Sequence, residues 1–76
     1  MTALQAAAKE KAAEIRDAHR GRGALSLSGL RRELGVSEDT AREWAKERGI
    51  GNRVGKRIVY DVASVAKYIV QERGMY

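Results

Sequence analysis

The chain has 76 residues and no cysteine, so it offers one small domain with a modest core, without disulfide bonds or thiolate metal sites. Its one histidine, His19, gives little support to a metal site or a histidine-based active site; we expect this residue at the surface, and no cofactor. The formal net charge of +5 makes a polyanion the first partner to consider.

Several other classes of protein are disfavoured by what the sequence does not contain. No apolar run approaches the ~20 residues that a membrane-spanning helix needs. The first residues, MTALQAAAKEKAAEIR, carry charges where a signal peptide has its apolar centre. No paired carboxylates, activated nucleophile or phosphate-binding loop is recognisable, so we expect a protein that is not an enzyme. We expect it in the cytoplasm, associated with the nucleoid and not with a membrane.

Residues 2–19 are predicted to form a helix, because they are rich in alanine, glutamate, lysine and arginine and contain no glycine or proline. The large apolar residues of this helix are only Leu4 and Ile15, next to a stripe of alanines that includes Ala18. A long isolated helix is marginal in water, so it needs a partner surface in this domain or in a second copy. We therefore divide the chain into an alanine-rich helix or arm, residues 1–22, and a main domain, residues 23–76.

Two short helices follow, separated by about three residues. The first carries leucines at i, i+3 and i+7, namely Leu27, Leu30 and Leu34, with Ser26 or Ser28 as its N-cap and Gly35 at its end. The second, about residues 37–48, has Ser37 as its N-cap and turns its apolar side, Ala41, Trp44 and Ala45, toward the core. The opposite side displays Asp39, Arg42, Glu43 and Lys46.

The remaining residues predict a β-hairpin and a closing helix. GNRVGKRIVY has branched residues on both sides of Gly55-Lys56, which is typical of two short strands joined by a tight turn. Asp61 is then a suitable N-cap for a helix that ends near Gly74. The expected fold is therefore mainly α with a small β-hairpin.

The helix over residues 37–48 is rich in acids, although DNA is a polyanion. Glu38 and Asp39 lie in its first turn, where the helix dipole favours negative charge. Glu43 can accept a hydrogen bond from cytosine N4, whereas Arg42 or Lys46 can donate to guanine. A solvated helix face joined by i,i+3 and i,i+4 ion pairs is the alternative interpretation.

Positive charge without acids is concentrated in residues 50–60, which contain Arg53, Lys56 and Arg57. These cations are suited to phosphate contacts, helped by Arg22, Arg31 or Arg32, because specific binders take position from phosphates and sequence from base edges. The alternative is a hairpin edge made basic to prevent strand pairing.

The segments SLSGLRRELGVSEDTAREWAKERG and RVGKRIVYDVASVAKYI resemble the MerR-like winged helix of the phage and plasmid excisionase group. The resemblance covers about residues 25–71, and the DNA-binding domain of phage terminase small subunits shares this fold. It implies a winged helix-turn-helix preceded here by an extra N-terminal helix. Gly29 and Arg31 depart from the pattern, since many relatives have glutamate and alanine there.

By position, the resemblance implies a recognition helix, about residues 37–48, in the major groove and a basic wing, residues 53–58, on the backbone. The implied DNA-binding residues are Ser37, Thr40, Arg42, Glu43, Lys46, Arg53, Lys56 and Arg57. The expected function is sequence-specific binding of double-stranded DNA, as an excisionase-like architectural factor or a small transcriptional regulator. Self-association is expected through the N-terminal helix or head-to-tail on DNA. The alternative is a protein-interaction adaptor that resembles a terminase small subunit or an antirepressor.

Overall fold

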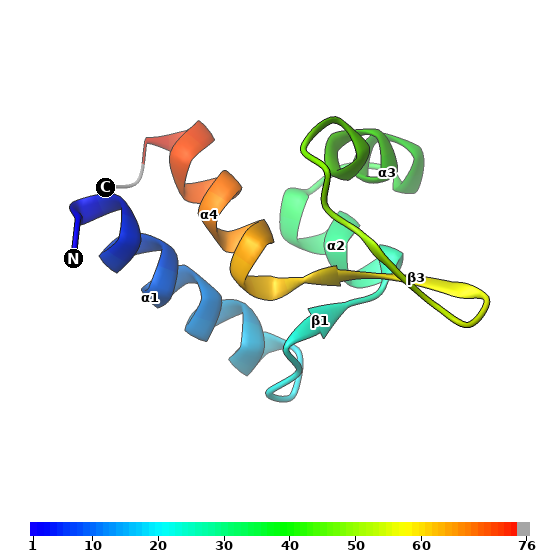
Figure 1. The fold of residues 1–76 in the computed structure, drawn as a ribbon, viewed down its shortest axis with the longest axis horizontal. Coiled ribbons are helices and arrows are strands. Elements are labelled where there is room, and N and C mark those ends of the chain that lie inside the picture. Colours follow the sequence, from blue (N-terminus) through cyan, green and yellow to red (C-terminus); the bar gives the residue numbers. More distant parts are fainter. Residues whose placement is uncertain (75–76) are drawn as a thin grey trace.

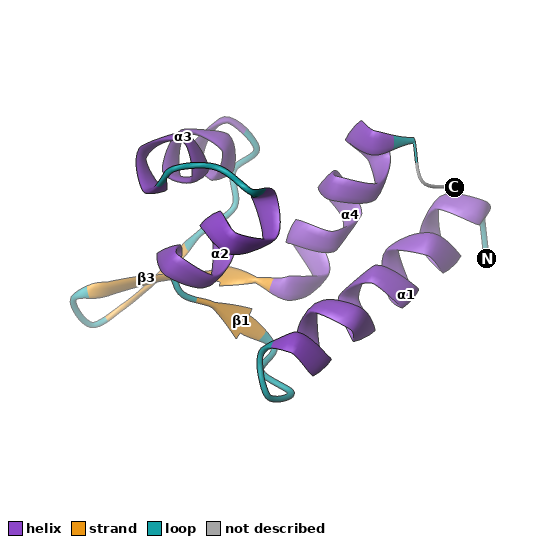
Figure 2. Cartoon of the chain, turned by 180° about the vertical axis from the view of Figure 1, so that it is seen from behind, coloured by secondary structure: helices purple, strands orange, loops and turns teal. Residues whose placement is uncertain are grey.

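The computed structural model describes residues 1–74, which form four helices and a small three-stranded antiparallel sheet (Figures 1 and 2). The elements in chain order are α1 (Ala3–Ala18), β1 (Ala24–Leu25), α2 (Leu27–Leu34), α3 (Glu38–Glu47), β2 (Asn52–Val54), β3 (Arg57–Asp61) and α4 (Val62–Arg73). The expected mainly α fold with a β-hairpin is thereby confirmed.

Side-chain caps fix where the helices of the main domain begin. The side chains of Ser26, Ser37 and Asp61 each accept a hydrogen bond from the backbone N–H three residues further on, which opens α2, α3 and α4. Gly35 ends α2 in the left-handed region with φ of 71°, a conformation that glycine adopts without steric cost. The predicted N-caps Ser37 and Asp61 are therefore confirmed, and of the two candidates for α2 the structure has Ser26.

The sheet has one strand that the sequence did not predict. Its order is β1-β3-β2, with Ala24 opposite Asp61 and Leu25 opposite Tyr60, all antiparallel. The predicted hairpin is confirmed as β2 and β3, joined by a two-residue turn in which Gly55 has φ of 63°. A strand as short as β1 shows no period in the sequence, and only its pairing with β3 defines it.

Helix α1 packs along α4, and the two lie side by side in both ribbon views (Figures 1 and 2). Its buried residues Ala12 and Ile15 belong to the same apolar cluster as Val62, Val65 and Ile69. The partner surface that α1 needs is therefore supplied by this domain, and residues 1–22 share one core with the residues that follow.

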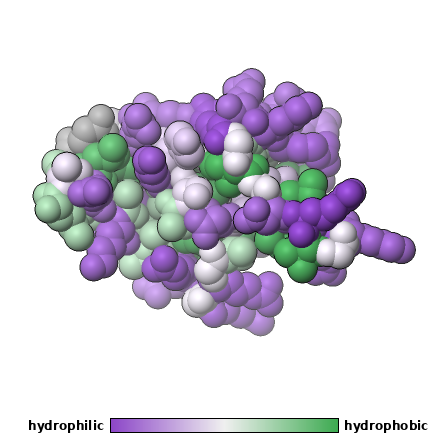
Figure 3. Space-filling view, in the orientation of Figure 1, coloured by the Kyte–Doolittle hydropathy of each residue, from purple (hydrophilic) through white to green (hydrophobic). Residues whose placement is uncertain are grey.

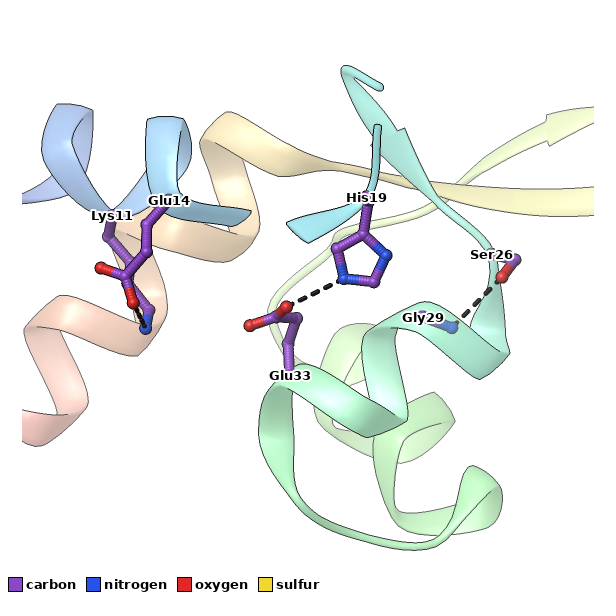
Figure 4. A network of polar contacts seen from close by, with 6 residues as sticks. All are labelled: Lys11, Glu14, His19, Ser26, Gly29 and Glu33. Atoms are coloured by element: carbon purple, nitrogen blue, oxygen red, sulfur yellow. Dashed lines mark hydrogen bonds and ion pairs between the residues drawn. The ribbon is translucent and has the colours of Figure 1, made fainter. Parts of the chain in front are cut away.

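Two expectations about the end of α1 are wrong. Ala18 is exposed and does not continue the buried stripe. His19 is not a surface residue, since its side chain is only 19% exposed and its Nε2 lies 2.8 Å from Oε1 of Glu33 in α2 (Figure 4). The chain reverses directly after α1, and this reversal carries the imidazole back against α2.

The aromatic of α3, Trp44, faces inward as predicted but at the rim of the core. It is partly buried, meets Tyr68 of α4 edge-on with ring centroids 6.5 Å apart, and lies 4.6 Å below the guanidinium carbon of Arg48. Its Nε1–H donates a 3.0 Å hydrogen bond to Glu72. Thus α4 holds α3 through polar as well as apolar contacts.

Candidate nucleic-acid interface

The outer face of α3 is open to solvent. Ala41 and Ala45 are completely or almost completely buried and anchor the helix on α2 and the core. The opposite side chains, all exposed, are Asp39, Arg42, Glu43 and Lys46. Helix α1 lies against α4, on the far side of the molecule, and does not cover this face.

Ion pairing on this face is sparse. Arg42 Nη1 lies 3.0 Å from Oδ1 of Asp39, with side chains 53% and 92% exposed. Exposed pairs of this kind contribute about 0.2–1 kcal/mol, so Arg42 can change partner at little cost. Within residues 1–74 neither Glu43 nor Lys46 is in an ion pair. A solvated face joined by many ion pairs, the alternative interpretation of this helix, would need more pairs than the single one between Arg42 and Asp39.

The side chains of Ser37 and Thr40 take part in the N-terminal cap of α3. The Ser37 hydroxyl accepts from the Thr40 backbone N–H at 3.2 Å and donates to the Thr40 hydroxyl at 3.0 Å. Both residues are exposed, so the Thr40 hydroxyl can still donate outward.

The three hairpin cations do not lie on one face. Arg53 pairs with Ile58 and Val54 pairs with Arg57, and cross-strand partners share a face while successive residues alternate. Arg53 therefore occupies one face of the hairpin, Arg57 occupies the other, and Lys56 lies in the turn. These cations are neighbours along the chain, but the strand register places Arg53 and Arg57 on different faces.

A groove joins α3 to the hairpin. It has a volume of about 260 Å³ and is lined by Arg42, Lys46, Ile50, Gly51, Ile58 and Tyr60. Gly51 has φ of 135°, and a Cβ there would meet Cγ2 of Ile58 at 3.3 Å. The glycine thus lets the chain leave α3 close to β3. Two cations from α3 consequently stand over an apolar floor from the hairpin.

The other face of β3 borders a second hollow of about 490 Å³. Its lining includes the guanidinium-bearing residues Arg22 and Arg57 and the hydroxyl-bearing residues Ser26 and Ser28. Of the helping cations that the sequence analysis considered, Arg22 reaches this hollow. Arg31 is partly buried and Arg32 is exposed further along α2.

Sequence reasoning missed two apolar side chains at the hairpin. Val54 is 61% exposed and Ile58 is 48% exposed, on opposite faces. In Figure 3 hydrophobic atoms lie beside the long hydrophilic side chains that project from this end of the molecule. Both residues could be recognised in the sequence as branched, but they were interpreted only as strand formers.

No family model, curated protein or solved structure matches this chain. Across residues 1–74, no three His, Asp or Glu side chains gather as a metal site requires, and no helix is long and apolar enough to cross a membrane.

Proposed function

We propose that the protein binds double-stranded DNA in a sequence-specific manner, with α3 in the major groove and the β2–β3 hairpin as a wing on the backbone. One observation carries the proposal: the exposed polar face of α3 and the hairpin line the same groove. Arg53 shares the face of the hairpin on which Ile58 lines this groove, so a duplex that receives α3 is within its reach.

In this proposal α3 contacts the bases and the hairpin contacts the phosphates. On α3, Arg42 or Lys46 donates to guanine O6 and N7 and Glu43 accepts from cytosine N4, which distinguishes base pairs. The hairpin cations neutralise phosphates and give affinity that does not depend on sequence. The acids on α3 are compatible with this role, because Glu38 and Asp39 lie in its first turn near the positive end of the helix dipole.

The role we propose is that of a non-enzymatic architectural factor of the excisionase type, or of a small transcriptional regulator. The apolar stripe of α1 is already used in the core, at Ala12 and Ile15. This favours copies arranged head-to-tail on tandem sites over pairing through α1.

Selection of bound sequences from a random duplex pool tests both points. We expect enrichment of one short motif, and repeats of that motif in direct orientation if copies bind head-to-tail. Inverted repeats would indicate a two-fold dimer and contradict the head-to-tail arrangement. If the protein fails to bind even random duplex at low salt, DNA binding itself is wrong.

One observation favours the second candidate, a protein-interaction adaptor. The exposed Val54 and Ile58 give the hairpin an apolar component that a protein partner could cover. Duplex binding at low salt discriminates between the two, because an adaptor of this kind requires an acidic protein and not a nucleic acid.

A further inference from the structure

The reversal of the chain after α1 forms a third hollow, away from the groove between α3 and the hairpin. It has a volume of about 260 Å³ and is lined by Ala18, His19, Arg20, Arg22 and Arg32. Three arginines from two separate segments thus meet around one small concavity. No carboxylate is among the lining residues.

The charge of these arginines is not neutralised within the described part of the chain. None of the three is in an ion pair with any of residues 1–74. Glu33, which lies close by, uses one of its oxygens for the imidazole of His19. This bond joins the turn after α1 to α2 (Figure 4). Arg20, Arg22 and Arg32 are close in sequence to the two residues that it joins, and all three line the hollow. A concentrated, unpaired positive charge at a fixed concavity is suited to an anion.

The backbone of Arg20 gives an independent indication that its side chain has a use. Arg20 has φ of 59°, and among residues 1–74 it is the one residue other than glycine with positive φ. Glycine and asparagine adopt this conformation more easily than residues with long side chains do. The backbone conformation of residue 20 therefore gives no reason for an arginine at this position. A function of the guanidinium is the simplest reason for its presence.

The hollow adjoins the one that borders the face of β3 turned away from α3. Arg22 lines it and also lines the neighbouring hollow that reaches Arg57 on β3. A row of basic side chains thus leads from the hairpin past the start of α2 to the turn after α1. A duplex offers phosphates at regular spacing along such a path.

We propose that Arg20, Arg22 and Arg32 form a phosphate-binding site that takes a backbone phosphodiester of the duplex held by α3 and the hairpin. This inference rests on the proposed function for the source of the phosphate, but the site itself can be tested without DNA. Guanidinium groups are suited to it, since they bind phosphate oxygens in a bidentate manner.

The first experiment uses inorganic phosphate and pyrophosphate. Titration into the full chain at constant ionic strength should shift the NMR signals of the Nε–Hε groups of the three arginines and the amides of residues 19–22. Chloride is the control anion. Shifts no larger than those with chloride would overturn the site, whatever the protein does with DNA.

The second experiment connects the site to DNA. Arg20→Asn keeps a residue that tolerates positive φ, so we expect an unchanged or higher Tm together with weaker duplex binding. Arg32→Ala should weaken binding similarly, and each variant should reduce the slope of log affinity against log salt by about 0.9. Lys9→Ala removes one exposed positive charge from α1 and serves as the matched control.

The outcomes separate the two proposals. Phosphate binding combined with duplex affinities equal to that of Lys9→Ala would overturn the backbone assignment. If the unaltered protein binds no duplex, the proposed function fails, while the phosphate titration still decides whether the three arginines form an anion site.

Discussion

The imidazole of His19 lies directly over Gly29, so that a Cβ at residue 29 would stand 3.3 Å from Cε1 of the ring. The same imidazole also contacts Glu33, with its Nε2 2.8 Å from Oε1 of that residue. Gly29 is buried in the first turn of α2, and glycine in a helix costs up to about 1 kcal/mol relative to alanine. The glycine at position 29 thus has a physical reason, because the missing side chain makes room for the ring.

We therefore expect His19 and Gly29 to be energetically coupled. Gly29→Ala should stabilise the unaltered protein by well under the ~1 kcal/mol that helix propensity provides, or destabilise it, because the ring must move. In a His19→Ala background the same change should give the full gain of about 1 kcal/mol. Urea unfolding of the four proteins measures the coupling, and equal effects in both backgrounds would show that the ring does not restrict residue 29.

The burial of Ile15 predicts that α1 is needed for the stability of the main domain. The side chain is 1% exposed, and replacing a buried isoleucine with alanine costs about 2–5 kcal/mol. For a domain this small we expect Ile15→Ala to be largely unfolded at 37 °C, as followed by circular dichroism. Lys9→Ala on the exposed side of α1 should change the free energy of unfolding by less than about 0.5 kcal/mol. A stable Ile15→Ala protein would mean that α1 is a dispensable arm.

The contacts of Glu72 predict a modest contribution to the position of α3. Its carboxylate accepts from Nε1 of Trp44 and from Arg48. The carboxylate and guanidinium side chains are 38% and 22% exposed, so solvent screens the pair. We expect Glu72→Ala to cost no more than about 1 kcal/mol and to change Trp44 fluorescence in the folded state. Glu72→Gln, which keeps an acceptor for the indole, should change the fluorescence less, and Gln71→Ala should leave it unchanged.

The hairpin cations predict how DNA binding depends on salt. If about five phosphates are neutralised, log affinity should fall against log salt with a slope of roughly −4.5. Replacing both Lys56 and Arg57 with alanine should reduce the magnitude of this slope by about 2 and weaken binding to all sequences alike. Electrophoretic or fluorescence titrations at several salt concentrations measure the slope. An unchanged slope would show that the hairpin does not contact the DNA phosphates.

For the outer face of α3 we predict effects that depend on the DNA sequence, unlike those of the hairpin cations. Glu43→Gln or Arg42→Ala should change the preference at one base pair by about 1–3 kcal/mol and leave binding to random duplex much less affected. Competition titrations with single-base variants of the selected site measure this change. An equal loss on every sequence would contradict the assignment of α3 as the reading element. Lys67→Ala, on the exposed side of α4, is the control.

Much of the fold could be predicted from the sequence because its causes are local. Ser26, Ser37 and Asp61 mark the starts of their helices through hydrogen bonds to residues three positions away. Gly55-Lys56 marks the turn of the hairpin, because the glycine can adopt the positive φ that this short turn has. Interactions of such short range leave a direct trace in the residue pattern.

The candidate site was predictable only in part. The outward face of α3 follows from helical phase, since Ala41 and Ala45 define the buried side. The groove beside it could not be predicted, because it depends on how close Gly51 brings β3 to the helix. The hollow around Arg20 and Arg32 also brings together residues that are distant along the chain.

The sequence by itself determined the helices, the caps at Ser37 and Asp61 and the hairpin, because backbone hydrogen bonding and side-chain periodicity act over a few residues. Only the tertiary structure decided that β1 pairs with β3, that the partly buried His19 packs against Gly29, and that Arg53 and Arg57 lie on opposite faces of the hairpin. These features depend on strand register and on the packing of distant segments, which no short window of sequence contains.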